Sequence, residues 1–247
     1  MVGHATVRFY GDLAEVAWDA DRHGLAQVPI DRPRSVKDAI ESCGVPHTEI
    51  DLVLVNGTSV AFTHLVSAGD RIAVYPMFVD LDVPSLVRPE PLPAVRFVLD
   101  VHLGRLARRL RLLGFDTAYR NDAGDAELAA QSAGERRWLL TRDRGLLMRG
   151  AVTHGYLVRS DDARLQVAEV MRRFQLSGQI AALTRCAHCN GLLAPVPKAD
   201  IEHLLQAGTR RDHDTFAQCS SCGQLYWEGS HAPELQAFAE EAGGVPE

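Results

Sequence analysis

Two aspartates stand directly after short apolar runs of the kind that forms buried β-strands. Asp100 follows residues 95–99, and Asp143 follows residues 138–142. In a parallel α/β sheet, ligands bind in the crevice beyond the carboxyl ends of the strands. Carboxylates held there could share a divalent cation, because Mg²⁺ and Mn²⁺ prefer carboxylate and water oxygens. The alternative is that each aspartate only caps the helix that follows it.

A third acidic residue favours the metal interpretation. Asp125 lies in an acidic cluster between the two strand-end aspartates. The three carboxylates together could bind one or two Mg²⁺ or Mn²⁺ ions, which would lower the pKa of a water that attacks a phosphodiester. Thr141, two residues before Asp143, could bond a carboxylate or a metal-bound water, or be an ordinary strand residue. Asp100, Asp125, Asp143 and Thr141 are therefore the candidate catalytic residues.

The segment that carries these acids is basic, although the whole chain is not. Fifteen arginines and no lysine against ten acids give residues 96–173 a net charge of +5, whereas the flanking segments carry −6 and −5. Arginine is suited to bidentate contacts with phosphate. The candidates for contacts with RNA phosphates are Arg105, Arg108, Arg109, Arg142 and Arg144. A solvated arginine face is the ordinary alternative.

Four of the five cysteines form two Cys-x-x-Cys pairs. Cys186 pairs with Cys189, and Cys219 pairs with Cys222 after a gap of 29 residues. Two such turns complete a tetrahedral Zn²⁺ site with Zn–S distances of about 2.3 Å. An iron site and reduced, free thiols are the alternatives. Because four sulfurs leave no open position, the zinc is expected to be structural, and folding of residues 184–228 should depend on it.

The composition is that of an ordinary globular protein. Of the 247 residues, 46% are hydrophobic and 23% charged, which allows one to three domains. The sequence contains neither an apolar run of about 18 residues nor a basic N-terminus followed by an apolar core. We therefore expect a cytoplasmic protein without a membrane partner.

The expected elements divide the chain into four parts. Residues 1–80 are expected to hold strands at 5–10, 26–30, 51–55 and 71–75 and a helix at 35–43, which is a small α+β domain. Four prolines between residues 84 and 93 predict a semi-rigid linker at 81–94. Strands then alternate with helices, which predicts a three-layer α/β sandwich with a parallel sheet at 95–178. The paired cysteines and the C-terminal tail occupy 179–247.

The N-terminal part resembles the β-grasp sulfur-carrier family, the family of ubiquitin-like folds. The resemblance rests on Val55-Asn56-Gly57 and on the run from Gly69 to Pro76. Sulfur carriers end in a free Gly-Gly tail that is adenylated, whereas here the chain continues past Pro76. The resemblance therefore implies a β-grasp domain that binds a protein partner or acts as a scaffold.

The remainder resembles the ribonuclease module at the carboxy end of the Mut-seven exonucleases. The motifs are the paired cysteines, Asp100-x-x-Leu103-Gly104-Arg105, Asp125-x-Glu127-Leu128, Leu140-Thr141-Arg142-Asp143-Arg144 and Tyr226-Trp227-x-Gly229-Ser230-His231. The resemblance implies a PIN-like nuclease core with an appended zinc ribbon, and its three core acids fall on Asp100, Asp125 and Asp143. PIN nucleases usually carry a further acid on an intervening helix, for which residues 113–124 are too short. The alternatives are that Asp122 or Glu127 compensates for the missing acid, or that the site holds metal weakly.

These inferences converge on a metal-dependent ribonuclease. It would hydrolyse RNA phosphodiesters with Mg²⁺ or Mn²⁺ at the aspartates and carry Zn²⁺ as a structural ion. The alternative is a non-catalytic RNA- or ribosome-binding adaptor whose β-grasp domain recruits a partner. Metal-dependent cleavage that is lost when Asp100 or Asp143 is replaced would distinguish the two.

Overall fold

The computed structural model describes residues 2–78 and 83–227, which form two compact units. The first unit combines the described residues up to Pro93 with Asp125–Leu157, and the second combines Ala94–Gly124 with the described residues from Val158 onward. The predicted boundary at residue 80 lies outside the described residues, and those at 94 and 178 stay predictions. Among the described residues, no helix has the length and apolar character needed to cross a bilayer.

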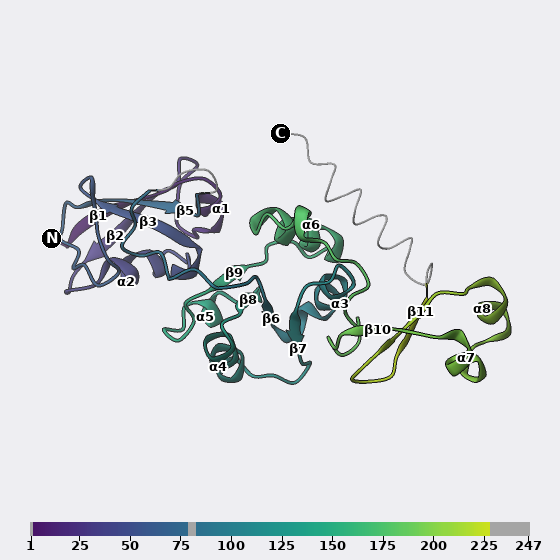
Figure 1. Cartoon of the computed structure of the whole chain (residues 1–247). Helices are drawn as coiled ribbons and strands as arrows, with labels where there is room; N and C mark the ends of the chain where they lie inside the picture. The colour runs from purple at the N-terminus through teal and green to yellow at the C-terminus, as the bar shows by residue number, and fades with distance from the viewer. Residues whose placement is uncertain (1, 79–82, 228–247) are drawn as a thin grey trace. The chain divides into compact units, whose positions relative to one another are not determined.

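The first unit begins with a five-stranded sheet in the order β2-β1-β5-β3-β4. This sheet lies in the purple to blue part of the ribbon in Figure 1. Its strands are β1 (Gly3–Phe9), β2 (Leu25–Ile30), β3 (Ile50–Val55), β4 (Thr58–Ser59) and β5 (Arg71–Pro76). The connecting helices are α1 (Leu13–Val16), α2 (Val36–Glu41) and the 3₁₀ turn η1 (His47–Glu49). β1 and β5 are parallel and the other neighbours antiparallel, so the ubiquitin-like β-grasp prediction is confirmed.

Local sequence explains this domain well. Alternate residues of β1, from Ala5 to Phe9, are buried and supply its core face. Asn56 and Gly57 have φ values of 51° and 87° and form the tight turn between β3 and β4. Ser35 accepts a hydrogen bond from the Asp38 N–H and so caps α2, as the sequence predicts.

The first unit also contains the second half of the α/β pattern. Its elements are α4 (Asp125–Glu135), β8 (Trp138–Thr141), α5 (Arg144–Leu147) and β9 (Gly155–Leu157). β8 and β9 are parallel, with Leu140 opposite Tyr156. Both strands are almost entirely buried, as expected for parallel strands covered on both faces.

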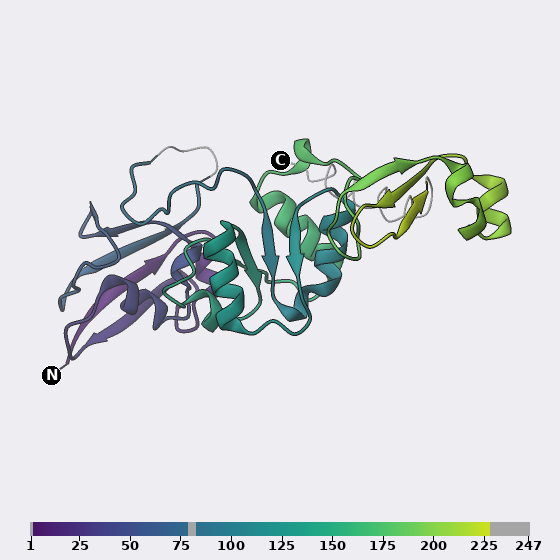
Figure 2. The same cartoon turned by 60° about the horizontal axis from the view of Figure 1, so that its bottom comes forward.

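The second unit contains the other parallel pair, β6 (Phe97–Leu99) and β7 (Thr117–Tyr119), whose arrows point the same way in Figure 2. The 3₁₀ turn η2 (Val101–Leu103) and helix α3 (Gly104–Leu112) connect them, and α6 (Ala163–Arg173) contacts α3. A 3₁₀ turn, η3 (Ser177–Gln179), follows. The elements of this unit alternate between strand and helix, as the sequence predicts for this part of the chain.

The two cysteine pairs belong to a separate part of the second unit, here called the four-cysteine module (residues 184–227). It consists of a small sheet and the turns and short helices around it. Its antiparallel strands are β10 (Leu193–Val196), β11 (Phe216–Cys219) and β12 (Leu225–Trp227). Three short helices follow β10: α7 (Lys198–Ile201), η4 (Glu202–Leu204) and α8 (Ala207–Asp212). Gly229, Ser230 and His231 of the predicted C-terminal motif lie outside the described residues.

Within the first unit, the β-grasp domain is bonded directly to β9 and the residues before it. Glu49 is 3% exposed, and its carboxylate accepts a hydrogen bond from the Leu157 N–H at 2.7 Å. The ring of His47 is bonded to the Val152 carbonyl at 2.9 Å through Nε2 and to Glu41 at 2.7 Å through Nδ1. These contacts stabilise the strand, because the buried carboxylate of Glu49 and both ring nitrogens of the half-buried His47 have hydrogen-bond partners.

Arg144 adds a second connection between the same parts. Its guanidinium donates to the carbonyls of Val16 at 2.7 Å and Gly44 at 3.2 Å. It also lies 5.1 Å from the ring centre of Trp18, a cation–π distance. Gly44 has φ of +84°, and a Cβ there would lie 2.6 Å from the Trp18 ring. Only glycine therefore allows the loop to approach this closely.

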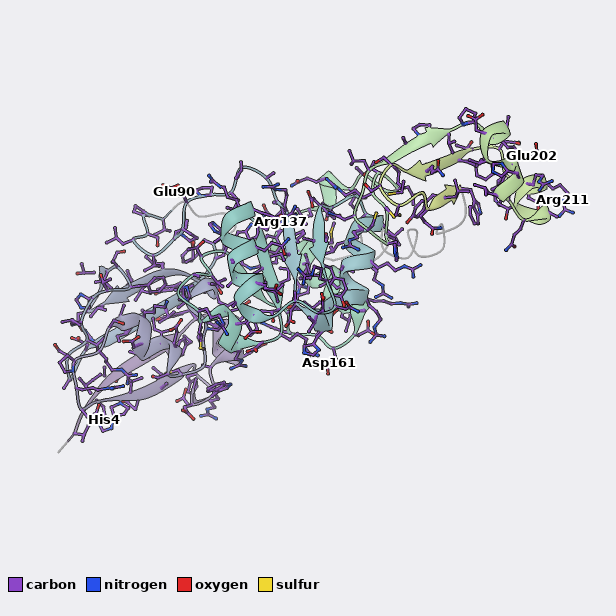
Figure 3. The ribbon with its side chains drawn as sticks, turned by 90° about the horizontal axis from the view of Figure 1, so that it is seen from below. His4, Glu90, Arg137, Asp161, Glu202 and Arg211 are labelled. Carbon is purple, nitrogen blue, oxygen red and sulfur yellow. The ribbon has the colours of Figure 1, made fainter. Side chains whose placement is uncertain are left out.

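The proline-rich segment before Pro93 is bonded to other parts of the first unit. Arg88 donates two hydrogen bonds, both of 2.7 Å, to the carboxylate of Asp51, which is buried in β3. The backbone oxygen of Glu90, labelled in Figure 3, is bonded to Nε2 of His154 at 2.8 Å. A bidentate pair between arginine and aspartate is geometrically specific, so this part of the segment has a defined path.

We expect Gly44→Ala to destabilise the protein more than Gly57→Ala. At Gly57, where φ is also positive and a Cβ would meet nothing within 4 Å, the left-handed conformation alone costs about 1 to 2 kcal/mol. At Gly44 the displacement of Trp18 and Arg144 adds about 1 to 3 kcal/mol. Urea unfolding of both variants measures the difference. Equal losses would show that this packing does not restrain the loop.

Candidate functional site

Asp100 lies at the carboxyl end of β6, as predicted. It is 6% exposed and occupies the N-cap position of η2, but its side chain makes no capping hydrogen bond. The turn is closed by the backbone, because the Leu103 N–H donates to the Asp100 carbonyl at 2.9 Å. The helix-capping alternative therefore does not apply to this aspartate. Burial of a carboxylate is costly, so such residues are typically hydrogen-bonded, paired or bound to a metal.

Asp143 differs, because its side chain does cap a helix. It follows β8, and its Oδ1 accepts hydrogen bonds from the N–H groups of Gly145 at 2.7 Å and Leu146 at 3.3 Å. Thr141 is fully buried, and its hydroxyl oxygen accepts from the Asp143 N–H at 2.9 Å. The two residues thus fix the loop after β8. The capping interpretation of Asp143 is confirmed, and the second carboxylate oxygen, Oδ2, is the atom left for a ligand.

The third candidate begins a helix rather than following a strand. Asp125 opens α4, and its Oδ2 accepts from Arg149 at 3.1 Å. Of the two candidates for a fourth acid, Asp122 is exposed and paired with Arg120, which lowers its pKa, and Glu127 is exposed on α4. Asp125 belongs to the first unit and Asp100 to the second, and their convergence on one cation stays a prediction.

The candidate RNA-binding arginines fall into different environments. Arg105 and Arg108 are exposed on α3, Arg109 is half-buried there, and Arg142 is exposed after β8. Arg144 instead donates to carbonyls of the β-grasp domain. The exposed pair on α3 has the placement expected of a phosphate-binding face.

The four cysteines converge closely enough to hold one zinc ion. All their sulfur atoms lie within 4.8 Å of one another. The Sγ atoms of Cys186 and Cys222 are 3.6 Å apart, and those of Cys189 and Cys219 are 3.4 Å apart. Tetrahedral zinc with Zn–S bonds of about 2.3 Å places its sulfurs roughly 3.8 Å apart, so the donors fit the ion.

Polar groups around two of the four sulfurs, those of Cys186 and Cys219, favour the thiolate, whereas the pKa values of Cys189 and Cys222 are raised. The Tyr226 hydroxyl donates to the Cys186 Sγ at 3.2 Å, and the Ser221 N–H lies 3.4 Å from the Cys219 Sγ. Burial raises the pKa of Cys219, but the N–H groups of Cys222 and Ser221 outweigh it and lower that pKa to about 6. Because zinc binds the thiolate, these donors support metal binding.

The four-cysteine module is attached to the α/β part by residues that the sequence did not single out. Arg111 is 5% exposed and donates to the carbonyls of Thr117, Ala187 and His188 at 2.9, 3.3 and 2.7 Å. Burial lowers its pKa, and the charges of the nearby cysteines and Asp116 oppose that shift. Only its place on a leucine-rich helix could have indicated that Arg111 is buried.

Asn190 makes the second attachment. Its side-chain oxygen accepts from the Thr117 N–H at 3.0 Å, and its amide group donates to Asp116 at 2.9 Å. Arg185 also lies 3.5 Å from the Asp116 carboxylate. An asparagine directly after the second cysteine of a Cys-x-x-Cys pair is the one sequence signal for this contact.

Comparisons with known proteins agree with this architecture. The family model for the Mut7-C RNAse domain matches residues 95–239, which is more than half of the chain. The chain belongs to the Mut7-C RNAse domain family. The model for the Mut7-C ubiquitin domain matches residues 2–82. The RNAse match spans every candidate acid, arginine and paired cysteine.

Solved structures match over about a third of this chain. Two structures of small archaeal modifier protein 1 from Haloferax volcanii are 27% and 24% identical over 30% and 31% of this chain. Each match covers 97% of the modifier, with TM-scores of 0.25 and 0.26. No curated protein matches the chain.

We expect Asp143→Ala to lower the free energy of unfolding by about 1 kcal/mol, because it removes the N-cap of α5. Asp143→Asn should cost much less, since an amide oxygen can still accept from Gly145 and Leu146. Urea unfolding of both variants tests this. Equal destabilisation by the two variants would contradict a capping role.

We expect one zinc ion per chain, and a lower melting temperature once a strong chelator removes it. The effect should extend beyond the module, because Leu112 of α3 packs in one cluster with Cys186, Cys219 and Tyr226. Cys186→Ser should lower the bound zinc, whereas Cys43→Ser, which alters the lone buried cysteine of the β-grasp domain, should not. Metal analysis with thermal unfolding measures both, and full zinc content in Cys186→Ser would exclude that ligand.

Proposed function

We propose that this member of the Mut7-C RNAse domain family hydrolyses RNA phosphodiester bonds with the help of Mg²⁺ or Mn²⁺. The observation that carries the proposal is the position of Asp100. It is a buried carboxylate at the carboxyl end of a parallel strand, inside the matched RNAse domain, and it does not cap the helix that follows. Such a position is where α/β proteins place ligand-binding groups.

The proposed roles follow from the local structure. Asp100, Asp125 and Asp143 would hold the divalent cations, and Asp122 or Glu127 would be a further acid. Thr141 keeps the Asp143 loop in place through its hydrogen bond to the backbone N–H. Bound cations would supply positive charge to the phosphate and acidify the attacking water.

The finer architecture is part of the same proposal. Residues 95–178 would be a PIN-like core, and residues 179–247 a zinc ribbon and tail. Arg105, Arg108, Arg109 and Arg142 would contact RNA phosphates, whereas the contacts of Arg144 favour a bracing role. The β-grasp domain at 1–80 would bind a protein partner, and the protein would act in the cytoplasm.

The test is Mn²⁺-dependent cleavage of labelled single-stranded RNA by the zinc-loaded full chain. Asp143→Asn should reduce the rate at least about 100-fold while the helix cap remains, since loss of a cation ligand removes several kcal/mol of transition-state stabilisation. Asp100→Asn should have a similar effect. Asp214→Asn, which alters an exposed carboxylate of the four-cysteine module, is the matched control and should cleave like the wild type.

Two outcomes would overturn the proposal. A folded, zinc-loaded wild type that cleaves none of several RNAs but binds them without metal would be an RNA-binding adaptor. Equal cleavage by the wild type and both variants would indicate a contaminating nuclease.

A further inference from the structure

A cavity of about 830 Å³ lies within the second unit, where α3 and the end of β7 meet the four-cysteine module. Arg108 and Arg111 of α3 line it, together with Arg120 after β7. His188 of the first cysteine pair and Trp227 of β12 line it from the module. Its volume is in the range of pockets that enclose small ligands. No candidate catalytic residue is among its lining residues.

The charge of the lining favours an anion. Its titratable side chains include three arginines and no carboxylate. Arg111 is buried among backbone carbonyls, and its charge is balanced by the nearby cysteine sulfurs. Arg108 and Arg120 are exposed, so their planar guanidinium groups can bind a phosphate that enters the cavity from solvent. Arg120 also forms an exposed ion pair with Asp122 at 3.0 Å through Nε, and Asp122 is not among the lining residues.

The lining also offers rings at fixed positions, Trp227 on the side of the four-cysteine module and Tyr119 on the side of β7. Trp227 is half-buried in β12, where it pairs with Phe216 in the sheet, and its ring centre is 6.3 Å from that of His213. Tyr119 is held by a hydrogen bond from its hydroxyl to the Val101 carbonyl at 2.9 Å. Such rings can stack on a base of any identity, because every base has a π-face.

We propose that this cavity binds single-stranded RNA, with phosphates on Arg108 and Arg120 and a base stacked on Trp227. A duplex does not fit this chemistry, because its bases are already stacked on one another. The inference deepens the proposed ribonuclease function by naming the form of RNA and its place of attachment. α3 begins only four residues after Asp100, so a strand held here is attached next to a proposed cation ligand.

The test measures anisotropy of labelled oligouridylate with the zinc-loaded full chain carrying Asp143→Asn, without divalent cations, so that no cleavage occurs. Trp227→Ala should weaken binding about 5- to 150-fold, which is the usual effect of removing one stacking side chain. Trp227→Phe should restore most of the affinity. Leu65→Ala, which shortens an exposed apolar side chain of the β-grasp domain, is the control and should not change binding.

The proposed phosphate contacts of Arg108 and Arg120 also predict how the RNA affinity depends on salt concentration. The double variant Arg108→Ala and Arg120→Ala should lower the slope of log K against log salt by about 1.4, since each phosphate contact to a single strand contributes about 0.7. Arg71→Ala, on an exposed residue of β5, should leave the slope unchanged. Both arginines are exposed, so zinc content and melting temperature should stay at their wild-type values.

Three results would overturn this inference: unchanged affinity of both Trp227→Ala and the arginine pair, equal weakening by Leu65→Ala, or displacement of the labelled oligouridylate by duplex RNA at equal affinity. Binding of polyglutamate in place of RNA would assign the cavity to an acidic protein partner and would overturn it too. Binding that depends on Trp227 in a wild type that cleaves no RNA would support the cavity while rejecting the ribonuclease function. Cleavage of RNA by a wild type whose RNA binding does not depend on Trp227 would support the ribonuclease function while rejecting the cavity as the binding site.

Discussion

The buried guanidinium of Arg111 is the interaction on which the second unit depends. It joins the end of α3 to the backbone of the first cysteine pair through three carbonyl acceptors. Burying a positive charge is costly unless acceptors and opposite charges surround it, and here carbonyls, cysteine sulfurs and Asp116 do so. The same helix begins just after Asp100 and lines the cavity. One arginine therefore couples the strand-end carboxylate, the cavity wall and the cysteine cluster into one framework.

Much of this fold could be predicted from local pattern alone. The strand and helix alternation, the Asn56-Gly57 turn and the position of Asp100 after β6 are encoded by residues close together in sequence. The cysteine cluster could also be predicted, because metal geometry restricts the spacing of its ligands. For Asp143 the sequence left capping and metal binding open, and the structure shows the cap without testing the metal.

The rest could not be predicted because it depends on contacts between distant residues. Arg111 and Arg144 look like other arginines of a basic segment. However, Arg111 donates to a carbonyl of the four-cysteine module 76 residues away, and Arg144 donates to carbonyls of the β-grasp domain 100 and 128 residues away. Net charge therefore overstates the positive surface that nucleic acid can reach. Hydrophobic periodicity also places α3 correctly while giving no sign that one of its cations is buried.

The bond between Glu49 and Leu157 has a consequence for how this protein can be divided. β9 pairs with β8 alone among the strands of its sheet, and an uncovered edge strand is a template for association with other chains. The β-grasp domain fills that position with a buried carboxylate bonded to the strand's own N–H. This contact shields part of the edge of β9 from pairing with another chain. A fragment that lacks residues 1–80 would expose that edge, and it should therefore associate with other chains more readily than the full chain does.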